Sequence, residues 1–283
     1  MNKLAIIGDT CLDLTFEMAE TYDFSLLSYH LQMDDRHLVD QVDITSREFY
    51  ERMENHDVLS TGIPSIQSVI DQLDELKAEG YTQALLMCAS EKVTGMRQLY
   101  EVVMSDYEGL DLYVFDTRQI ASSGGLMVIY AAQMNKSGKT VDEIIEELER
   151  IKDQSNIYAL FRTLKYVIKG GRLNKYAGAL GTFLNIQPIL RDIDGEVGII
   201  DKVRGKKKSF TALIDYIEKA LKNSDRYYLA IFSGNNDEEK EMLKEALKMY
   251  IDKAEFFLET ELSPVLGVHA GPESIGISFI KID

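Results

Sequence analysis

The chain has 283 residues, a length that favours one large α/β unit or two closely packed lobes with room for a ligand. Its 31 Lys and Arg against 47 Asp and Glu give a formal net charge of −16, which argues against a nucleic-acid binder with a broad basic surface. The composition, 45% hydrophobic and 28% charged, is that of a globular chain that can bury a sizeable core.

An apolar run at residues 4–7 opens the chain and is far shorter than the hydrophobic segment of a secretory signal. Eighteen apolar residues never follow one another, which excludes a membrane span. The two cysteines, Cys11 and Cys88, are too few for a disulfide scaffold or a thiolate zinc cluster. We therefore expect a cytoplasmic protein without stable membrane insertion.

Short apolar runs alternate with longer amphipathic stretches, which is typical of crossover units on mainly parallel sheets. The expected strands are 4–7, 84–88, 112–116, 159–162, 227–232, 255–259 and 275–280. The expected helices are 46–53, 66–79, 95–107, 124–137, 141–154, 209–222 and 238–249. Long loops are expected at 29–44 and 170–185.

The sharpest change along the chain comes at 153–172, where an acidic helix is followed by a strand and then by a Gly-rich basic turn. This change predicts an N-terminal α/β lobe over 1–160 and a C-terminal α/β lobe over 161–283. The boundary leaves room for segments of one lobe to belong to the other.

Two segments resemble catalytic motifs without meeting their requirements. Residues 137–140, Ser-Gly-Lys-Thr, end like a phosphate-binding loop, but Gln133 stands at the leading glycine and the segment joins two helices. Residues 9–13 follow the first strand as in phosphatases with an aspartyl nucleophile, but the second acid comes four positions after Asp9 instead of two. Asp9 could still contact a ligand, because it ends a parallel strand.

The remaining nucleophile and metal patterns are absent. There is no G-x-S-x-G elbow, and the four histidines, at positions 30, 37, 56 and 269, show no metal spacing. Cys88 could pair with His269, although a cysteine at a strand end is more often buried filler. The sequence predicts no catalytic apparatus, no metal and no cofactor.

Three polar segments are candidates for binding. Residues 61–65, Thr-Gly-Ile-Pro-Ser, form a turn before a helix, and residues 90–95 open another helix with Thr94 as its expected N-cap. Free N–H groups at a helix start suit a carboxylate or a phosphate, although ordinary capping explains both segments equally well. The third segment, 269–276, begins with His269 and leads into the last strand.

Two basic stretches stand out in this acidic chain, at 169–172 and at 202–208. The second holds five basic residues within seven positions. It is either a solvated turn or a docking surface for an anionic ligand group or an acidic partner.

In this order, the segments resemble the DegV family, the bacterial fatty-acid-binding proteins that include the lipid-carrying subunits of fatty acid kinase. The resemblance runs over essentially the whole chain and is most specific in its later part. The matching segments are 8–10 (family T-D-S), 61–65 (T-S-Q-P-S), 90–95 (S-S-x-L-S-G), 116–124 (D-S…S-x-G), 164–172 (L-x-Y-L-x-K-G-G-R), 184–190 (L-N-I-K-P-I-L), 202–207 (K-x-R-G-x-K) and 269–272 (H-x-G-P).

The resemblance implies two α/β lobes that enclose a tunnel for one long acyl chain, with its carboxylate between them. It places the ligand's head group at Thr61, Thr94, Ser90, His269 and Arg172. It also implies that a partner kinase docks at a basic surface and that the bound lipid is a fatty acid or an acyl phosphate. The residues expected at that surface are Arg172, Arg204, Lys206 and Lys207.

The chain departs from the family pattern near the expected head group. Gly62 and Ile63 replace Ser-Gln, Glu91 replaces a serine, and Glu273 stands where glycine is usual. Acids beside a bound carboxylate would oppose it, so these two glutamates either point away or indicate another head group. Two other functions therefore remain open: a stand-alone hydrolase or phosphotransferase that uses Asp9, Cys88 or His269, and a regulatory binder of another anionic amphiphile.

Overall fold

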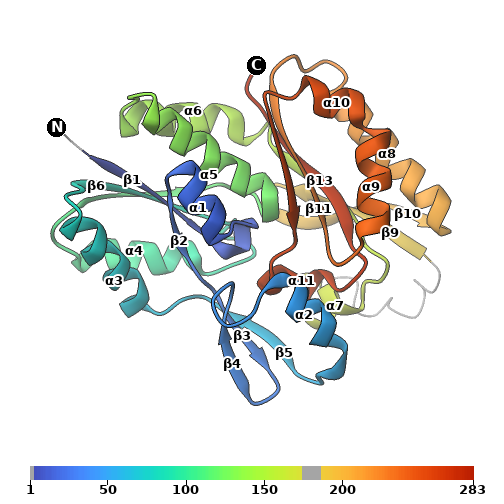
Figure 1. Ribbon diagram of the computed structural model, residues 1–283, viewed down its shortest axis with the longest axis horizontal. Helices are drawn as coiled ribbons and strands as arrows, with labels where there is room; N and C mark the ends of the chain where they lie inside the picture. Colours follow the sequence, from blue (N-terminus) through green and yellow to red (C-terminus); the bar gives the residue numbers. More distant parts are fainter. Residues whose placement is uncertain (1–2, 174–185) are drawn as a thin grey trace.

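The computed structural model describes residues 3–173 and 186–283 (Figure 1). Its strands form a four-stranded, a six-stranded and a three-stranded sheet. No helix in these two ranges is both long and apolar enough to cross a membrane. The part of the expected loop 170–185 that begins at residue 174 lies outside the described residues, as do Leu184 and Asn185 of the L-N-I segment.

The four-stranded sheet is wholly parallel, as the sequence predicts. In spatial order it contains β2 (Ser25–Leu27), β1 (Leu4–Asp9), β6 (Gln83–Cys88) and β7 (Asp111–Asp116). Helices α3 (Ile66–Ala78) and α4 (Met96–Asp106) pack together on one face, and α1 (Phe16–Tyr22) and α5 (Ala121–Lys136) cover the other (Figure 1). Because both faces are covered, the central strand β1 is buried along its whole length.

The six-stranded sheet corrects the expectation of mainly parallel strands. Its order is β10 (Glu196–Arg204), β9 (Ile186–Ile193), β8 (Asn156–Leu160), β13 (Ile275–Lys281), β11 (Tyr227–Ser233) and β12 (Phe256–Glu261). Only β11 and β12 pair in parallel. A two-residue turn at Asp194 and Gly195, both with positive φ (54° and 80°), joins β9 to β10 and forces these strands to run antiparallel.

The two faces of this sheet belong to two hydrophobic clusters. Helix α8 (Lys206–Leu221) packs with α9 (Asp237–Ala246) and α10 (Lys248–Lys253) on the outer face, so the single helix expected at 238–249 is two. On the inner face α5 contacts β8, β11 and β13, and it also contacts β1 of the four-stranded sheet. Helix α5 therefore joins the two sheets, with α6 (Val141–Lys152) packed beside it.

Two strands of the three-stranded sheet lie within the loop predicted at 29–44, and the third ends in the turn predicted at 61–65. β3 (His30–Met33) pairs antiparallel with β4 (Arg36–Val39) and with β5 (Leu59–Gly62). Helix α11 (Pro264–Ala270) packs against β3, β5, α2 (Ser46–Arg52) and α7 (Lys165–Lys169). In the part of the chain that the structure describes there are also two short 3-10 helices, η1 (Thr10–Leu12) and η2 (Met53–Asn55).

The division of the chain into lobes 1–160 and 161–283 stays a prediction. β8 precedes that boundary in sequence and pairs with β9 and β13, which follow it. Helix α11 lies near the end of the chain but packs on elements that belong to the first 62 residues of the chain. If the lobes are defined by sheets, the six-stranded sheet includes β8 from the first half of the chain, and α11 from the second half packs on the three-stranded sheet.

Candidate ligand-binding site

An apolar pocket lies where the six-stranded sheet, α11 and the loops of the four-stranded sheet meet. Its empty space, counted together with the part that is open to solvent, is about 840 Å³. Most of the wall is hydrocarbon. Its apolar residues include Ala159, Phe161, Val167, Leu190, Phe232 and Val265.

Two hydroxyl groups mark the polar end of this pocket. Thr61, on β5, has its Oγ1 3.1 Å from Nε2 of His269 on α11. The Oγ1 of Thr94 lies 2.7 Å from the hydroxyl of Tyr29, which precedes β3. The expectation that Thr94 caps its helix is wrong: Gly95 is the N-cap of α4, and the Thr94 hydroxyl bonds to Tyr29 instead. Segments that lie 208 residues apart in sequence thus meet at one point.

The imidazole of His269 is neutral at physiological pH. Burial, and then the positive charge of Arg172, lower its pKa from 6.5 to about 3. Its Nδ1 has no hydrogen-bond partner among the described residues. The backbone of Gly170 packs on the ring so closely that a Cβ there would lie 2.0 Å from Nδ1. This contact gives a physical reason for glycine at the third position from the end of the 164–172 segment.

Arg172 stands at the mouth of the pocket. Its side chain is exposed and donates to the carbonyl oxygens of Gly170 at 2.7 Å and Val93 at 3.3 Å. Arg172 lines the apolar pocket and also two polar hollows beside it, one lined by Thr61 and Thr94 and the other by Lys92. A guanidinium at this position offers the positive charge that a carboxylate or phosphate needs.

Thr61, Thr94, His269 and Arg172 therefore line one pocket, whereas Ser90 does not. Ser90 is buried, its Oγ accepts from the backbone N–H of Lys92 at 3.3 Å, and Gly195 of the β9–β10 turn packs against it. The second basic stretch contains three residues that are expected at the docking surface. These residues are exposed and lie outside the pocket lining: Arg204, Lys206 and Lys207.

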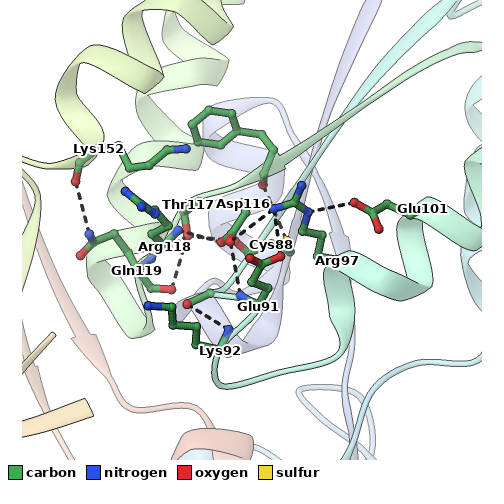
Figure 2. A network of polar contacts seen from close by, with 12 residues as sticks. Cys88, Glu91, Lys92, Arg97, Glu101, Asp116, Thr117, Arg118, Gln119 and Lys152 are labelled. Atoms are coloured by element: carbon green, nitrogen blue, oxygen red, sulfur yellow. Dashed lines mark hydrogen bonds and ion pairs between the residues drawn. The ribbon is translucent and has the colours of Figure 1, made fainter. Parts of the chain in front are cut away.

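The two glutamates that depart from the family pattern are each paired with a cation. Glu91 accepts from the guanidinium of Arg97 at 2.9 Å, and Figure 2 shows that this arginine also reaches Glu101 and Asp116. Glu273 lies 3.6 Å from the ammonium of Lys206. Neither carboxylate lines the apolar pocket. Glu91 nevertheless lines the polar hollow that Thr61, Thr94 and Arg172 share, so a different anionic head group stays an open alternative.

Two of the three groups named for a stand-alone enzyme lie away from the pocket wall. Asp9 is fully buried and accepts from the backbone N–H of Cys11 at 2.9 Å. The Sγ of Cys88 contacts the carbonyl oxygen of Phe115, and burial raises the pKa of this thiol far above its usual range. A protonated, enclosed thiol is a poor nucleophile. Within 3–173 and 186–283, no group of three His, Cys, Asp or Glu side chains is arranged to hold a metal ion.

Tyr29 and Cys11 also line the pocket, and neither is among the binding residues expected from the sequence. Tyr29 comes two residues after the edge strand β2 ends, at the same end of the sheet where Asp9 ends β1. Its place at a strand's carboxyl end was a usable signal, but the segment read as part of a loop. Cys11 carried no such signal, because its exposure to the pocket depends on the short helix η1.

Fold and site together define an α/β protein with an apolar pocket closed by a neutral histidine, two threonine hydroxyls and an arginine. A family model described as "Uncharacterised protein, DegV family" matches residues 3–282, and the chain belongs to this family. A DegV domain-containing protein of Clostridium acetobutylicum is 32% identical over 283 residues, which covers 99% of this chain and 100% of that protein.

Two solved structures are similar over their whole length. DegV from Bacillus subtilis, described as a fatty acid binding protein, has a TM-score of 0.90 at 22% identity, and the match covers 99% of this chain and 100% of that one. A stearic acid-binding protein from Eubacterium ventriosum has a TM-score of 0.85 at 24% identity, with 100% and 99% covered. These two structures confirm the α/β fold expected from the sequence, and the family model confirms the expected family.

Proposed function

We propose that this protein is a cytoplasmic carrier that holds one long-chain fatty acid in the apolar pocket and presents its carboxylate, or an acyl phosphate, to a partner kinase. The observation that carries this proposal is the division of the pocket into a hydrocarbon wall and one polar end. An acyl tail requires only a dry apolar channel, whereas its head group requires donors. The family, and relatives described as binding fatty acids, support the same ligand class.

The energetics favour retention of such a ligand. At about 0.8 kcal/mol per buried CH₂, a sixteen-carbon tail contributes roughly 10 kcal/mol of gross burial energy. The head group gains from the charge of Arg172 and from hydroxyl donors, while a neutral His269 adds no charge of its own. The fatty acid therefore dissociates slowly enough to survive purification. Both cysteines are free and buried, which fits a reducing compartment.

We expect organic extraction of the purified protein to release about one fatty acid per chain, identified by mass spectrometry. Thr61→Val combined with Thr94→Val removes both head-group hydroxyls at nearly constant side-chain volume. At about 1.5–3 kcal/mol for each hydrogen bond to a charged group, the two losses sum to about 3–6 kcal/mol, so the double variant is expected to lose at least about 100-fold in affinity.

The matched control is Thr21→Val with Thr211→Val, whose hydroxyls bond only to their own helices, at Glu17 O and Lys207 O. This pair should bind the fatty acid as the parent protein does. If the parent protein carries no acyl chain and takes none up on incubation, the carrier function is wrong. Unchanged affinity in the Thr61/Thr94 pair would place the head group elsewhere.

We further propose that the kinase docks on the basic surface formed by Arg172 and the stretch 202–208. Arg204 and Lys207 are exposed at the amino end of α8. Changing both to Glu should abolish acyl phosphate formation by the fatty acid kinase of the source organism, because a kinase with an acidic face would be repelled. Fatty-acid binding should persist, since neither side chain lines the pocket.

The control for docking is Lys219→Glu with Lys222→Glu. These lysines are exposed at the other end of α8, about 20 Å away for a helix of this length. This pair of substitutions changes the net charge by the same amount as the Arg204 and Lys207 pair. If both pairs reduce phosphorylation equally, only overall charge matters and the docking surface is wrongly assigned.

A further inference from the structure

Three buried carboxyl groups surround the short helix η1 and take no part in the site described above. Asp9, Asp13 and Asp40 are each at most 1% exposed. Asp9 precedes η1 and accepts from the backbone N–H of Cys11 within it. The other two carboxyl groups face the amino end of α11, and that of Asp13 also lies beside the backbone N–H of Ser122 on α5.

Asp13 holds the residue at which α11 begins. Its Oδ1 accepts from the backbone N–H of Ser263 at 2.9 Å, in a buried environment. Ser263 is the N-cap of α11, and its own side chain makes no capping hydrogen bond. Asp13 itself has a positive φ of 55°, so its backbone is held in the left-handed region where this contact is made.

Asp40 approaches the same helix end from the three-stranded sheet. It follows β4, and its carboxyl group lies beside the backbone N–H of Val265 and the hydroxyl of Thr10. Neither carboxyl oxygen of Asp40 has a fully formed hydrogen bond within the described ranges. A helix that starts with Pro264 leaves the N–H groups of its first turn without partners inside the helix, so nearby acceptors stabilise it.

Helix α11 is the element that brings His269 to the pocket. It has only seven residues, and its Val265, Leu266 and Ala270 also line the pocket wall. Its carboxyl end continues into Gly271, whose φ of 75° and close packing on Tyr166 leave little freedom there. His269 lies near this carboxyl end, but a helix of seven residues has only about two turns, so a shift of its amino end would also tilt the turn that carries His269.

We propose that Asp13 and Asp40 are positioning residues for the ligand's head group: they fix the amino end of α11 and so hold His269 against Thr61. This inference rests on the proposed function, since it concerns the same pocket. Asp9 is the contrasting case, because it is equally buried and adjacent to η1, but its bonded partner lies in η1 and not in α11.

The protonation of these carboxyls affects how firmly they hold the helix. Burial raises the pKa of Asp13 to about 8 and that of Asp40 to about 7. The charged or titratable groups that act on this region are Asp9, Cys11, Tyr50, Glu261 and Arg172. An ionised carboxylate accepts more strongly than a protonated one, but both retain an acceptor oxygen, as does asparagine. Asparagine variants are therefore expected to keep most of the contact, and alanine variants to lose it.

The test reads His269 directly in the ligand-free protein, by ¹⁵N NMR of its imidazole, with the signal assigned by His269→Gln. In the parent protein the ring should stay neutral down to about pH 4, because its pKa is about 3. In Asp13→Ala and Asp40→Ala the ring should become more hydrated and its pKa should rise to about 5 or higher. Palmitate affinity, measured separately, should fall about tenfold in both, as expected for one weakened head-group contact.

Three further variants make the outcome decisive. Asp13→Asn should give the same His269 signal as the parent protein. Asp9→Ala should lower the thermal midpoint of unfolding but leave the His269 signal unchanged. Ser263→Pro removes the donor that Asp13 binds, and the φ of −59° at Ser263 accepts proline. It should reproduce Asp13→Ala even if the latter fails to fold. A parent-like His269 signal in Ser263→Pro and Asp40→Ala would overturn the proposal. If the parent protein binds no palmitate, the carrier function fails, and the NMR result still decides whether the two acids position the helix.

Discussion

Ala159→Phe is expected to empty the pocket of its acyl chain while the protein stays folded. Ala159 is buried on β8, pairs with Leu190 and Gly276 on the neighbouring strands, and lines the pocket wall. A phenyl ring there would occupy the space of about four CH₂ groups. At about 0.8 kcal/mol each, the lost burial is about 3 kcal/mol, or on the order of 100-fold in the dissociation constant.

The measurement is titration of delipidated protein with palmitate, together with mass spectrometry of the lipid that copurifies. Leu160→Phe is the matched control, because it places the same ring one residue along the strand, on the opposite face, where Leu160 packs in the cluster under α8. That variant is expected to cost about 1–3 kcal/mol of stability through overpacking and to leave palmitate affinity unchanged. Equal binding by the parent protein and Ala159→Phe would mean that the acyl chain does not follow this pocket.

The parallel sheet was readable from the sequence because its signal is local. The strands β1, β6 and β7 are six residues long, each is built on an apolar run of four or five residues and is followed by a helix, and both faces of the sheet are covered. The antiparallel pairing in the six-stranded sheet also has a local signal in the sequence, although the expectation was of mainly parallel strands. The Asp194-Gly195 pair between alternating apolar residues is a strong hairpin signal, and it predicts antiparallel pairing of the flanking segments. The alternation of strands and helices along the whole chain favoured parallel sheets and outweighed this hairpin signal.

The head-group end of the site could be predicted only through resemblance to a family. Thr61 and His269 are separated by 208 residues, and no periodicity or spacing brings them together. The sequence gives no signal for α11, because a helix of seven residues is too short to show a helical period of apolar residues. The assignment of Ser90 to the head group also came only from a matching motif and stays a prediction. In the structure its hydroxyl contacts its own loop and the β9–β10 turn.

The free energy of unfolding is expected to fall as the pH rises from 6.5 to 8. Burial raises the pKa of Asp9 and Asp40 to about 7 and that of Asp13 to about 8, from the ordinary value of 3.8. Over this pH range the unfolded chain has already lost these protons, whereas the folded protein still holds some of them. Because the folded state binds more protons, stability is lost as they dissociate, by about 3 kcal/mol in all if the three groups titrate at these values.

His269 has the opposite sign and acts in a different range. Its pKa is lowered from 6.5 to about 3, so it reduces stability only as the pH falls below about 6.5, where the unfolded chain takes up the proton first. Above pH 6.5 the three aspartates supply most of the change, because Asp192, whose pKa burial raises to about 6, titrates mainly below that pH. This makes pH 6.5 to 8 the range to measure. Urea denaturation at pH 6.5, 7.25 and 8 should show the decline in the parent protein, and Asp13→Asn should remove the largest share of it. An unfolding free energy that stays level or rises over this range would mean that the three carboxyls are already ionised in the folded state.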